Sequence, residues 1–439
     1  MTNPVKAIPA KTRRLEARRV ATATFIGTTL EWYDFYIYAA CAALVFGPLF
    51  FPSDDALIGQ LAALGTFAVG FVARPLGGVI AGHFGDLLGR KKMLVLTMLA
   101  MGISTFAVGL LPTYATAGVI APVLLVVLRL IQGAAMGGEW GGAVSLAVEH
   151  APPGRRSVYG SAPMLGSPAG LMLANAVLLG LVAVTGDNFA VWGWRMAFLS
   201  SIVLVVVGIY TRRKLPESPD FDENAAAKTE RIPLLEVVTR HPRALLAALV
   251  ISGVPGISTY MVLTYALSYG TAEIGYSRTA LLVIGIVVCV LQLVAIPLLA
   301  GIADRSGTRK LVLLAAVLQA AGAVILFPLI NTGNLALAAL GSIFGVLPTA
   351  LTYAVLPAIL SEQFPTKIRY TGISLAYQLG AILGGGIAPI IATALLAATG
   401  TSTAIGLYMV AANVLMLICV FGLRRSPRTQ FATVSSTTD

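Results

Sequence analysis

Charged side chains are scarce in this sequence: 11% of its 439 residues are Asp, Glu, Lys or Arg, whereas 57% are apolar. Soluble globular domains have about 25% charged and about 45–50% apolar residues. The deficit of charge extends along the whole chain, so one membrane anchor does not account for it. This composition excludes an ordinary soluble domain and predicts many membrane spans.

Cysteine and histidine are also scarce, with three residues of each. The cysteines lie inside apolar runs, without the spacing of metal ligands or of a disulfide framework. The histidines lie at or beside the connections between runs. We therefore expect neither a metal nor a cofactor. We also expect no enzymatic activity, because no cluster of His, Asp or Ser gathers at one membrane face.

Apolar runs of about 20 residues or more, the length that spans a bilayer, recur twelve times. They are predicted to be helices, because lipid leaves no other way to satisfy their backbone polar groups. The predicted spans are 20–50, 58–83, 93–112, 119–148, 157–185, 192–211, 244–270, 279–302, 311–330, 335–361, 371–398 and 402–423.

A long polar connection at 212–243 divides the spans into two groups of six. We expect an N-terminal bundle at 20–211, a C-terminal bundle at 244–423, and polar tails at 1–19 and 424–439, the second of them disordered. Of the 30 Lys and Arg residues, 26 lie in the two tails or in the even-numbered connections. Positive charge marks the cytoplasmic side, so both termini are predicted to be cytoplasmic.

The two groups of spans repeat the same short motifs. Asp-x-x-Gly-x-Lys-Lys follows span two at 86–92, and Asp-x-x-Gly-x-Arg-Lys follows span eight at 304–310, 218 residues later. Glu-x-x-Pro-x-x-x-Arg follows span four at 149–156 and span ten at 362–369, 213 residues later. The nearly equal offsets indicate a duplicated six-span unit, which is typical of carriers that bind substrate between two halves.

These motifs carry a resemblance to a known family. The loop at 82–92 (GHFGDLLGRKK) resembles the signature of the major facilitator superfamily, and the segment at 131–137 (IQGAAMG) resembles its sugar-transporter signature. Position 308 holds Thr where that superfamily usually has Arg. Four further segments are similar to the metabolite:proton symporters, with the shikimate-type carriers nearest: 31–36, 73–78, 137–142 and 192–195. The resemblance implies a twelve-helix fold and proton-coupled transport of a metabolite such as shikimate, 2-oxoglutarate, citrate, proline or betaine.

Five charged side chains are predicted inside spans, where each costs at least about 2.5–3.5 kcal/mol on insertion scales. They are Glu31, Asp34, Arg74, Arg129 and Glu139. Three acids and two bases leave one excess negative charge, which favours proton uptake by one carboxyl. We predict that Asp34 carries the proton with Arg129 as its partner, as the resemblance to sugar:proton symporters also implies, and that Glu31 is the second candidate. The alternative is a set of fixed ion pairs that hold the helices together.

The second half has no ionisable group deep in any predicted span, so we expect it to offer hydrogen bonds to the substrate. Each polar or aromatic side chain on its own also fits a packing role. The predicted substrate contacts are Trp32, Tyr36, Tyr38, Gln132, Asn175, Tyr260, Gln292, Tyr353, Tyr377 and Gln378.

The cytoplasmic motifs are predicted to act as a gate. A carboxylate there can cap the N-terminus of a neighbouring helix or pair with an arginine. Such contacts exist only while the cytoplasmic side is closed, so they set the balance between two states. The predicted gating residues are Gly85, Asp86, Gly89, Arg90, Lys91, Glu149, Arg156, Asp304, Gly307, Arg309, Glu362 and Arg369.

The sequence therefore predicts a proton-driven importer of a small organic acid or related polar metabolite in a bacterial plasma (inner) membrane, functional as a monomer. A zwitterion such as proline or betaine is the alternative substrate. A proton-antiport exporter and a sensor built on a carrier fold are further alternatives. Nucleic acid is not an expected partner, because the basic residues form no stripe with interleaved aromatic side chains.

Overall fold

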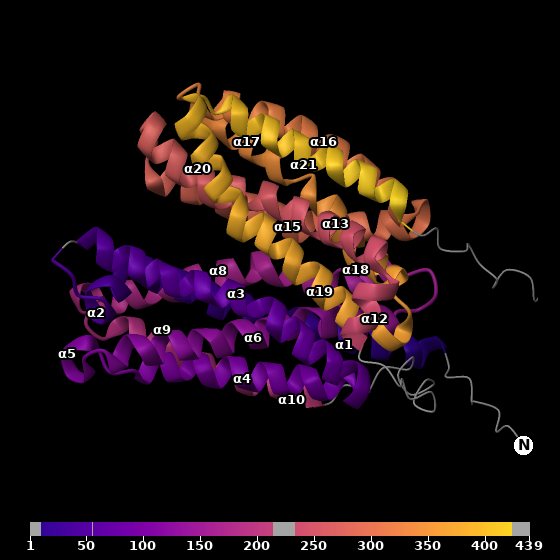
Figure 1. The fold of residues 1–439 in the computed structure, drawn as a ribbon, viewed down its shortest axis with the longest axis horizontal. Helices are drawn as coiled ribbons and strands as arrows, with labels where there is room; N and C mark the ends of the chain where they lie inside the picture. The colour runs from indigo at the N-terminus through magenta and orange to yellow at the C-terminus, as the bar shows by residue number, and fades with distance from the viewer. Residues whose placement is uncertain (1–9, 55, 214–232, 424–439) are drawn as a thin grey trace, which may run out of the picture.

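The computed structural model describes residues 10–54, 56–213 and 233–423, and they are almost entirely helical (Figure 1). The first half of the chain forms one helical bundle, coloured indigo to magenta in Figure 1, and the second half forms another, coloured pink to yellow. The predicted all-helical class is confirmed. Most of the predicted connection at 212–243, the start of the N-terminal tail and the C-terminal tail at 424–439 lie outside the described residues.

The N-terminal bundle contains the helices and helical turns α1 (Ala10–Cys41), η1 (Ala42–Phe46), α2 (Gly47–Phe50), α3 (Ala56–Leu88), α4 (Arg90–Leu110), α5 (Tyr114–Ala117), α6 (Ile120–Glu149), α7 (Arg156–Gly160), η2 (Ala162–Leu165), α8 (Gly166–Thr185), η3 (Gly186–Phe189), α9 (Gly193–Leu199) and α10 (Ser201–Arg213). The α1 helix starts ten residues before the predicted span. Its extra turns, residues 10–19, consist mainly of Arg, Ala, Lys and Glu, which favour helix without being apolar enough as a group to enter lipid.

The C-terminal half contains α12 (Pro233–Arg240), α13 (Pro242–Tyr260), η4 (Met261–Tyr265), α14 (Ala266–Tyr269), η5 (Gly270–Ile274), α15 (Arg278–Ser306), α16 (Thr308–Ile330), α17 (Leu335–Val346), α18 (Thr349–Gln363), η6 (Thr366–Ile368), α19 (Arg369–Ala381), η7 (Ile382–Ile387), α20 (Ala388–Thr399) and α21 (Thr403–Gly422). Among the described residues, nine helical segments are long and apolar enough to cross a membrane. The remaining three predicted spans coincide with α1, with α3, and with α9 and α10.

Glycine sets the distance between α3 and α6, the two helices that carry three of the five charges predicted inside spans. A Cβ atom at Gly77 would lie 1.7 Å from the carbonyl oxygen of Ala134, and one at Gly137 would lie 1.9 Å from that of Arg74. Only hydrogen at these positions lets the backbones approach so closely, as in other tightly packed membrane helices. This contact brings Arg74 on α3 beside the helix that bears Arg129 and Glu139.

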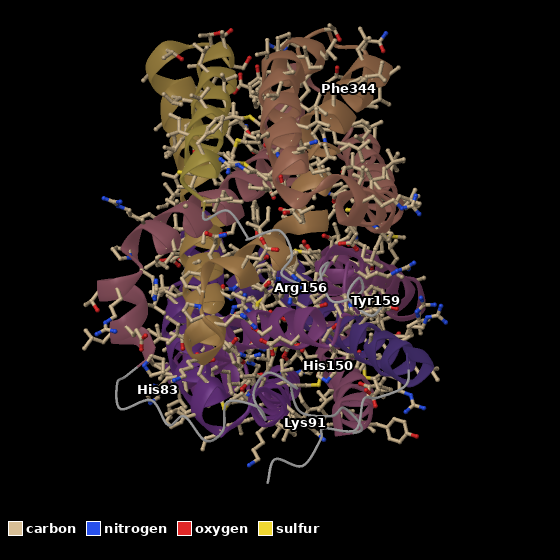
Figure 2. The ribbon with its side chains drawn as sticks, turned by 90° about the vertical axis from the view of Figure 1, so that its right-hand side faces the viewer. His83, Lys91, His150, Arg156, Tyr159 and Phe344 are labelled. Atoms are coloured by element: carbon tan, nitrogen blue, oxygen red, sulfur yellow. The ribbon has the colours of Figure 1, made fainter. Side chains whose placement is uncertain are left out.

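The two bundles meet along α3 and α6 against α19, and along α7 against α15 and α18. These contacts lie toward the end of the molecule that carries the turns α3–α4, α6–α7, α15–α16 and α18–α19, which we name the basic end (at the right in Figure 1). Figure 2 looks onto this end and shows Arg156 and Tyr159 where the bundles meet. Toward the other end the ribbons of the two bundles diverge.

The repeated motifs adopt the same backbone in both halves. Gly89, between α3 and α4, has φ 107° and ψ 144°, and Gly307, between α15 and α16, has φ 98° and ψ 134°. Residues with a side chain rarely adopt such positive φ angles, which explains why both motifs have glycine at this position. A π-helical turn also recurs, at η1 and at η4, and such turns often mark places where a helix bends. The duplicated sequence is thus a duplicated structure.

Candidate functional site

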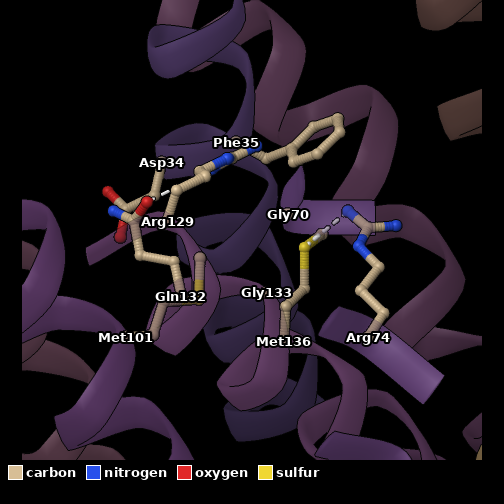
Figure 3. Close-up of a pocket in the computed structure, with 9 residues that line it drawn as sticks. All are labelled: Asp34, Phe35, Gly70, Arg74, Met101, Arg129, Gln132, Gly133 and Met136. Carbon is tan, nitrogen blue, oxygen red and sulfur yellow. Dashed lines mark hydrogen bonds between the residues drawn. The ribbon is translucent and has the colours of Figure 1, made fainter. Parts of the chain in front are cut away.

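The first cavity lies inside the N-terminal bundle and joins α1, α3, α4 and α6. Figure 3 shows Asp34, Arg129 and Gln132 on one side of this cavity and Arg74 with Met136 on the other. Its lining residues are Asp34, Phe35, Gly70, Arg74, Met101, Arg129, Gln132, Gly133 and Met136. One small cavity therefore brings together a carboxyl and two guanidinium groups.

Asp34 and Arg129 are joined by a hydrogen-bonded chain of neutral side chains. Arg129 Nη1 donates to Gln132 Oε1 over 3.2 Å, and Gln132 Nε2 donates to Thr105 Oγ1 over 2.8 Å. Thr105 Oγ1 in turn donates to Asp34 Oδ2 over 3.0 Å. We name this chain the relay. It connects the predicted partners through Thr105, which the sequence did not single out.

Arg129 and Arg74 both lie against aromatic rings, but their polar contacts differ. The guanidinium carbon of Arg129 lies 4.1 Å from the ring centre of Tyr38. That of Arg74 lies 4.4 Å from the ring centre of Phe71 and 4.5 Å from that of Phe35. Arg74 Nη2 donates to the thioether sulfur of Met136 over 2.6 Å, and its Nε makes no hydrogen bond within the described part of the chain. Aromatic faces and a weak acceptor thus surround a buried cation whose hydrogen-bonding capacity is not filled.

A second cavity lies on the other side of Asp34. It is lined by Gly27, Leu30, Glu31, Asp34, Met98, Met101, Gly102, Glu139 and Val205, from α1, α4, α6 and α10. The three predicted membrane carboxyls therefore converge on one space, and Asp34 belongs to both cavities. Glu31 and Asp34 share a helix face, as their three-residue spacing predicts.

One predicted substrate contact of the N-terminal half, Gln132, lines the first cavity, and four others do not: Trp32, Tyr36, Tyr38 and Asn175. Trp32 packs on Tyr36, with ring centres 5.5 Å apart, and Tyr36 Oη lies 3.1 Å from Ser167 Oγ on α8. Tyr38 is fully buried, with its hydroxyl 2.6 Å from Thr66 Oγ1. Asn175, half-buried on α8, is not among the residues that line the two cavities.

The C-terminal half contributes Tyr260, which packs against the cluster around Phe35, Phe71 and Met136. The other side chains of this half that were predicted to contact substrate make hydrogen bonds within the half or to the N-terminal bundle. Tyr353 Oη lies 3.3 Å from Thr259 Oγ1, and Gln292 Nε2 donates to Thr349 Oγ1 over 3.0 Å. Tyr260 is therefore the residue of this set that faces the N-terminal charges most directly.

Tyr377 and Gln378 hold the two bundles together. The ring of Tyr377 stacks on that of Trp140 with centres 3.5 Å apart and planes at 9°. Gln378 Nε2 donates to the carbonyl oxygen of Gly137 over 3.0 Å. Both contacts fall on the turn of α6 that carries Glu139, so in this state the two side chains serve the interface between bundles.

We name the two lines of contact between the bundles at the basic end the α3–α19 seam and the α7–α15 seam, after the helices that meet there. In the α3–α19 seam, a carboxylate of one half binds a helix N-terminus of the other. Asp86 accepts the backbone N–H of Tyr370 over 3.2 Å, and the N–H and hydroxyl of Thr371 over 3.0 and 2.8 Å. A Cβ at Gly85 would lie 2.1 Å from the Tyr370 ring, so only glycine allows this approach. The predicted helix cap therefore forms, across the two halves.

A buried ion network reinforces the α3–α19 seam. Glu149 pairs with Arg90 on its own half and with Arg369 on the other, at 2.7 Å for the second pair. Arg90 Nη2 also donates to the carbonyl oxygen of Thr366 over 3.1 Å. Lys91 lies half-buried beside this network at the start of α4.

The α7–α15 seam repeats the cap. Asp304 accepts the backbone N–H groups of Ser157 over 2.8 Å and Val158 over 3.1 Å. Arg156 is exposed, and its charge reaches the half-buried Glu362. Arg309 lies away from the seam. Its Nη2 donates to the carbonyl oxygen of Phe421 within the C-terminal bundle. Eleven of the twelve predicted gating residues thus gather at the two seams and their turns, and Arg309 does not.

Comparison with known proteins identifies the family. Residues 20–231 and 221–438 each match the family described as "Sugar (and other) transporter". The chain is 42% identical to the inner membrane metabolite transport protein YhjE of Escherichia coli K12, over 92% of this chain and 93% of that protein. It is 39% identical to the shikimate transporter of the same organism, over 94% and 95%. The chain belongs to the sugar and other transporter family of the major facilitator superfamily.

One further relative supports the family, and one solved structure shows the fold. The chain is 33% identical to the proline/betaine transporter of Salmonella typhimurium, over 92% of this chain and 82% of that protein. Its fold matches the proton:xylose symporter XylE bound to 6-bromo-6-deoxy-D-glucose with a TM-score of 0.76 at 19% identity, over 93% and 96% of the chains. The comparisons with relatives confirm the predicted family. They also confirm two further predictions, that the chain is a transporter rather than an enzyme and that it is a multi-pass membrane protein.

Thr105 belongs to this transporter's site, but it is not among the site residues predicted from the sequence. A threonine inside an apolar run usually bonds a carbonyl of its own helix, and Thr105 does lie 3.0 Å from the carbonyl oxygen of Met101. Its second contact, with Asp34, joins residues 71 positions apart. No spacing along the chain marks a contact that depends on how α4 packs against α1.

Proposed function

We propose that this transporter imports a small organic acid together with protons, as a monomer in a bacterial inner membrane. It would use twelve membrane spans with both termini in the cytoplasm, and alternate between states open to either side. The observation that carries the proposal is the first cavity, which Asp34 lines together with Arg74 and Arg129.

The case for an anionic substrate rests on Arg74. This side chain is 3% exposed, lies against aromatic faces, and has an Nε donor without a hydrogen bond among the described residues. An unfilled buried donor is unfavourable, and a guanidinium is shaped to hold a carboxylate by two parallel hydrogen bonds. Tyr260 and Tyr377 lie within electrostatic reach of Arg74 from the other half. They would contribute hydroxyl groups to a substrate held between the bundles.

The case for proton coupling rests on Asp34. Its carboxyl is buried, belongs to both cavities, and is connected through the relay to Arg129. A proton that neutralises Asp34 changes the charge facing Arg129 and thereby the stability of each state of the carrier. Glu31 and Glu139 line the second cavity and are the secondary proton candidates.

The two seams supply the gate. If the basic end faces the cytoplasm, as the Lys and Arg distribution favours, the contacts of Asp86, Glu149 and Asp304 close the cytoplasmic side. Opening toward the cytoplasm must then break both helix caps and the ion network. Substrate and proton together would have to favour that opening, as alternating access requires.

Uptake into proteoliposomes tests the proposal. Labelled shikimate, 2-oxoglutarate, proline and betaine are offered with and without an inward proton gradient, to the wild-type protein, Asp34→Asn and the control Asp187→Asn, an exposed acid in η3. We expect gradient-driven accumulation of one acid by the wild type and the control, and equilibration without accumulation by Asp34→Asn. Accumulation by Asp34→Asn would reject this proton carrier. Accumulation of proline or betaine instead would replace the anionic substrate by a zwitterion.

A further inference from the structure

The hydroxyl of Thr105 has two acceptors at the same distance. Its Oγ1 lies 3.0 Å from Asp34 Oδ2 and 3.0 Å from the carbonyl oxygen of Met101. A threonine hydroxyl has a single hydrogen, so it satisfies one of these acceptors at a time. The same oxygen accepts the Gln132 amide over 2.8 Å in either case. Thr105 therefore has two complete hydrogen-bond arrangements without any movement of its heavy atoms.

We infer that Thr105 is a positioning residue for proton exchange at Asp34, its hydroxyl turned to the carboxylate while Asp34 is ionised and to Met101 once Asp34 is protonated. This inference rests on the proposed proton coupling by Asp34. The proton enters on the Asp34 carboxylate, which then donates to Thr105 Oγ1, and the Thr105 hydrogen moves by rotation to the Met101 carbonyl. No bond between heavy atoms forms or breaks, and every donor keeps an acceptor.

This rotation keeps Gln132 in one orientation. In both arrangements Gln132 Nε2 donates to Thr105, so its Oε1 stays directed at Arg129. The relay therefore keeps its hydrogen bonds to Arg129 in both charge states of Asp34. Both forms of Asp34 bond to Thr105, but the bond that the ionised form accepts is the stronger one, so the hydroxyl eases release of the proton from a buried carboxyl.

Other charged and titratable groups also face Asp34, and they act on its protonation together with Thr105. They are Glu31 and Tyr33 from α1, Arg74 from α3, and Arg129 and Glu139 from α6. The cavity-lining residues from α4 and α10 are apolar or glycine: Met98, Met101, Gly102 and Val205. Thr105 is thus the polar contact that α4 makes with Asp34.

The test compares Thr105→Val with Thr105→Ser and with Thr97→Val. Thr97 lies two turns earlier on α4, is buried, and bonds the carbonyl oxygens of Met93 and Leu94 in its own helix, so it is a matched control. The readouts are the pH profile of net uptake and substrate counterflow at equal pH, which needs no net proton release. Thr105→Ala serves as the second variant if Thr105→Val does not fold.

We expect Thr105→Val to hold the Asp34 proton more tightly. The alkaline limb of net uptake then moves upward by about one pH unit, because a hydrogen bond to a charged group is lost. Counterflow stays unchanged, and Thr105→Ser and Thr97→Val keep the wild-type profile. A profile for Thr105→Val that matches Thr97→Val overturns the inference, and it leaves the proposed function standing if Asp34→Asn has lost accumulation. If Asp34→Asn still accumulates substrate, the proposed carrier itself fails, whatever Thr105→Val does.

Discussion

The two seams at the basic end share one device but differ in what surrounds it. In the α3–α19 seam, Asp86 caps the N-terminus of α19, and in the α7–α15 seam, Asp304 caps that of α7. Each carboxylate accepts two successive backbone N–H groups from the opposite half. Both caps place a negative charge at the positive end of a helix dipole.

The difference lies in the buried charge beside each cap. Glu149 and Arg90 are each 1% exposed and belong to a network that crosses the α3–α19 seam to Arg369. At the corresponding place of the α7–α15 seam, Thr308 replaces the arginine, and the remaining pair consists of the exposed Arg156 and the half-buried Glu362. Charge pairs weaken as water reaches them, so the α7–α15 seam should be the weaker of the two. The cap is common to both seams, and the buried arginine beside it is present in the α3–α19 seam.

The largest expected effect comes from removing the shared acid of the stronger seam. Glu149→Gln takes away the negative charge that Arg90 and Arg369 have in common, and breaking such a buried network costs about 3–5 kcal/mol. The matching change in the weaker seam, Glu362→Gln, should cost about 1 kcal/mol or less. Thermal unfolding of the purified protein in detergent measures both. Equal losses of Tm in the two variants would show that the seams do not differ as described.

An intermediate effect is expected from removing the negative charge of either cap. Asp86→Asn and Asp304→Asn each exchange a carboxylate for an amide at a helix N-terminus, which removes a charge–dipole interaction of about 0.3–2 kcal/mol. Asp304→Asn should open the basic end more, because less buried charge remains to hold its seam. Thiol labelling of the buried Cys289 from the basic-end side of oriented vesicles reports the opening, with Asp187→Asn as control. Greater labelling in Asp86→Asn than in Asp304→Asn would reverse the ranking.

The smallest effect is expected from giving the α7–α15 seam the arginine that the α3–α19 seam has at the corresponding position. Thr308→Arg supplies a guanidinium where Arg90 stands in the other half, at a partly exposed position, so its gain is about 0.2–1 kcal/mol. A firmer α7–α15 seam should slow net uptake a few-fold and reduce thiol labelling from the basic end. Lys310→Arg, an exposed change on the same helix that keeps its charge, is the control. Faster uptake in Thr308→Arg would contradict a gating role for this seam.

Much of this architecture could be predicted from composition and spacing. The constant offsets between the two motif pairs predicted a duplicated unit, and Gly89 and Gly307 have matching backbone angles in the structure. Charged residues inside apolar runs predicted the buried site, because a charge in lipid is retained only for a reason. The transport role of Asp34 and of its neighbours stays a prediction.

Other features could not be predicted in this way. Tyr377 and Gln378 were expected to contact substrate, but in this state they bind α6 through Trp140 and Gly137. Arg309 shares a motif position with Lys91 but lies against α21 instead of the seam. In each case the outcome depends on which helix lies opposite, and a motif within one helix does not contain that information.

The sequence by itself determined the membrane class, the repeated motifs of the two halves and the identity of the buried charges, because hydropathy, spacing and charge are properties of the chain. The tertiary structure alone decided which partners these groups have. It placed Thr105 and Gln132 between Asp34 and Arg129, and it made Arg90 a buried member of a network that crosses the two halves. These contacts join residues far apart in the chain, and their strength depends on burial, which only the packing of the helices sets.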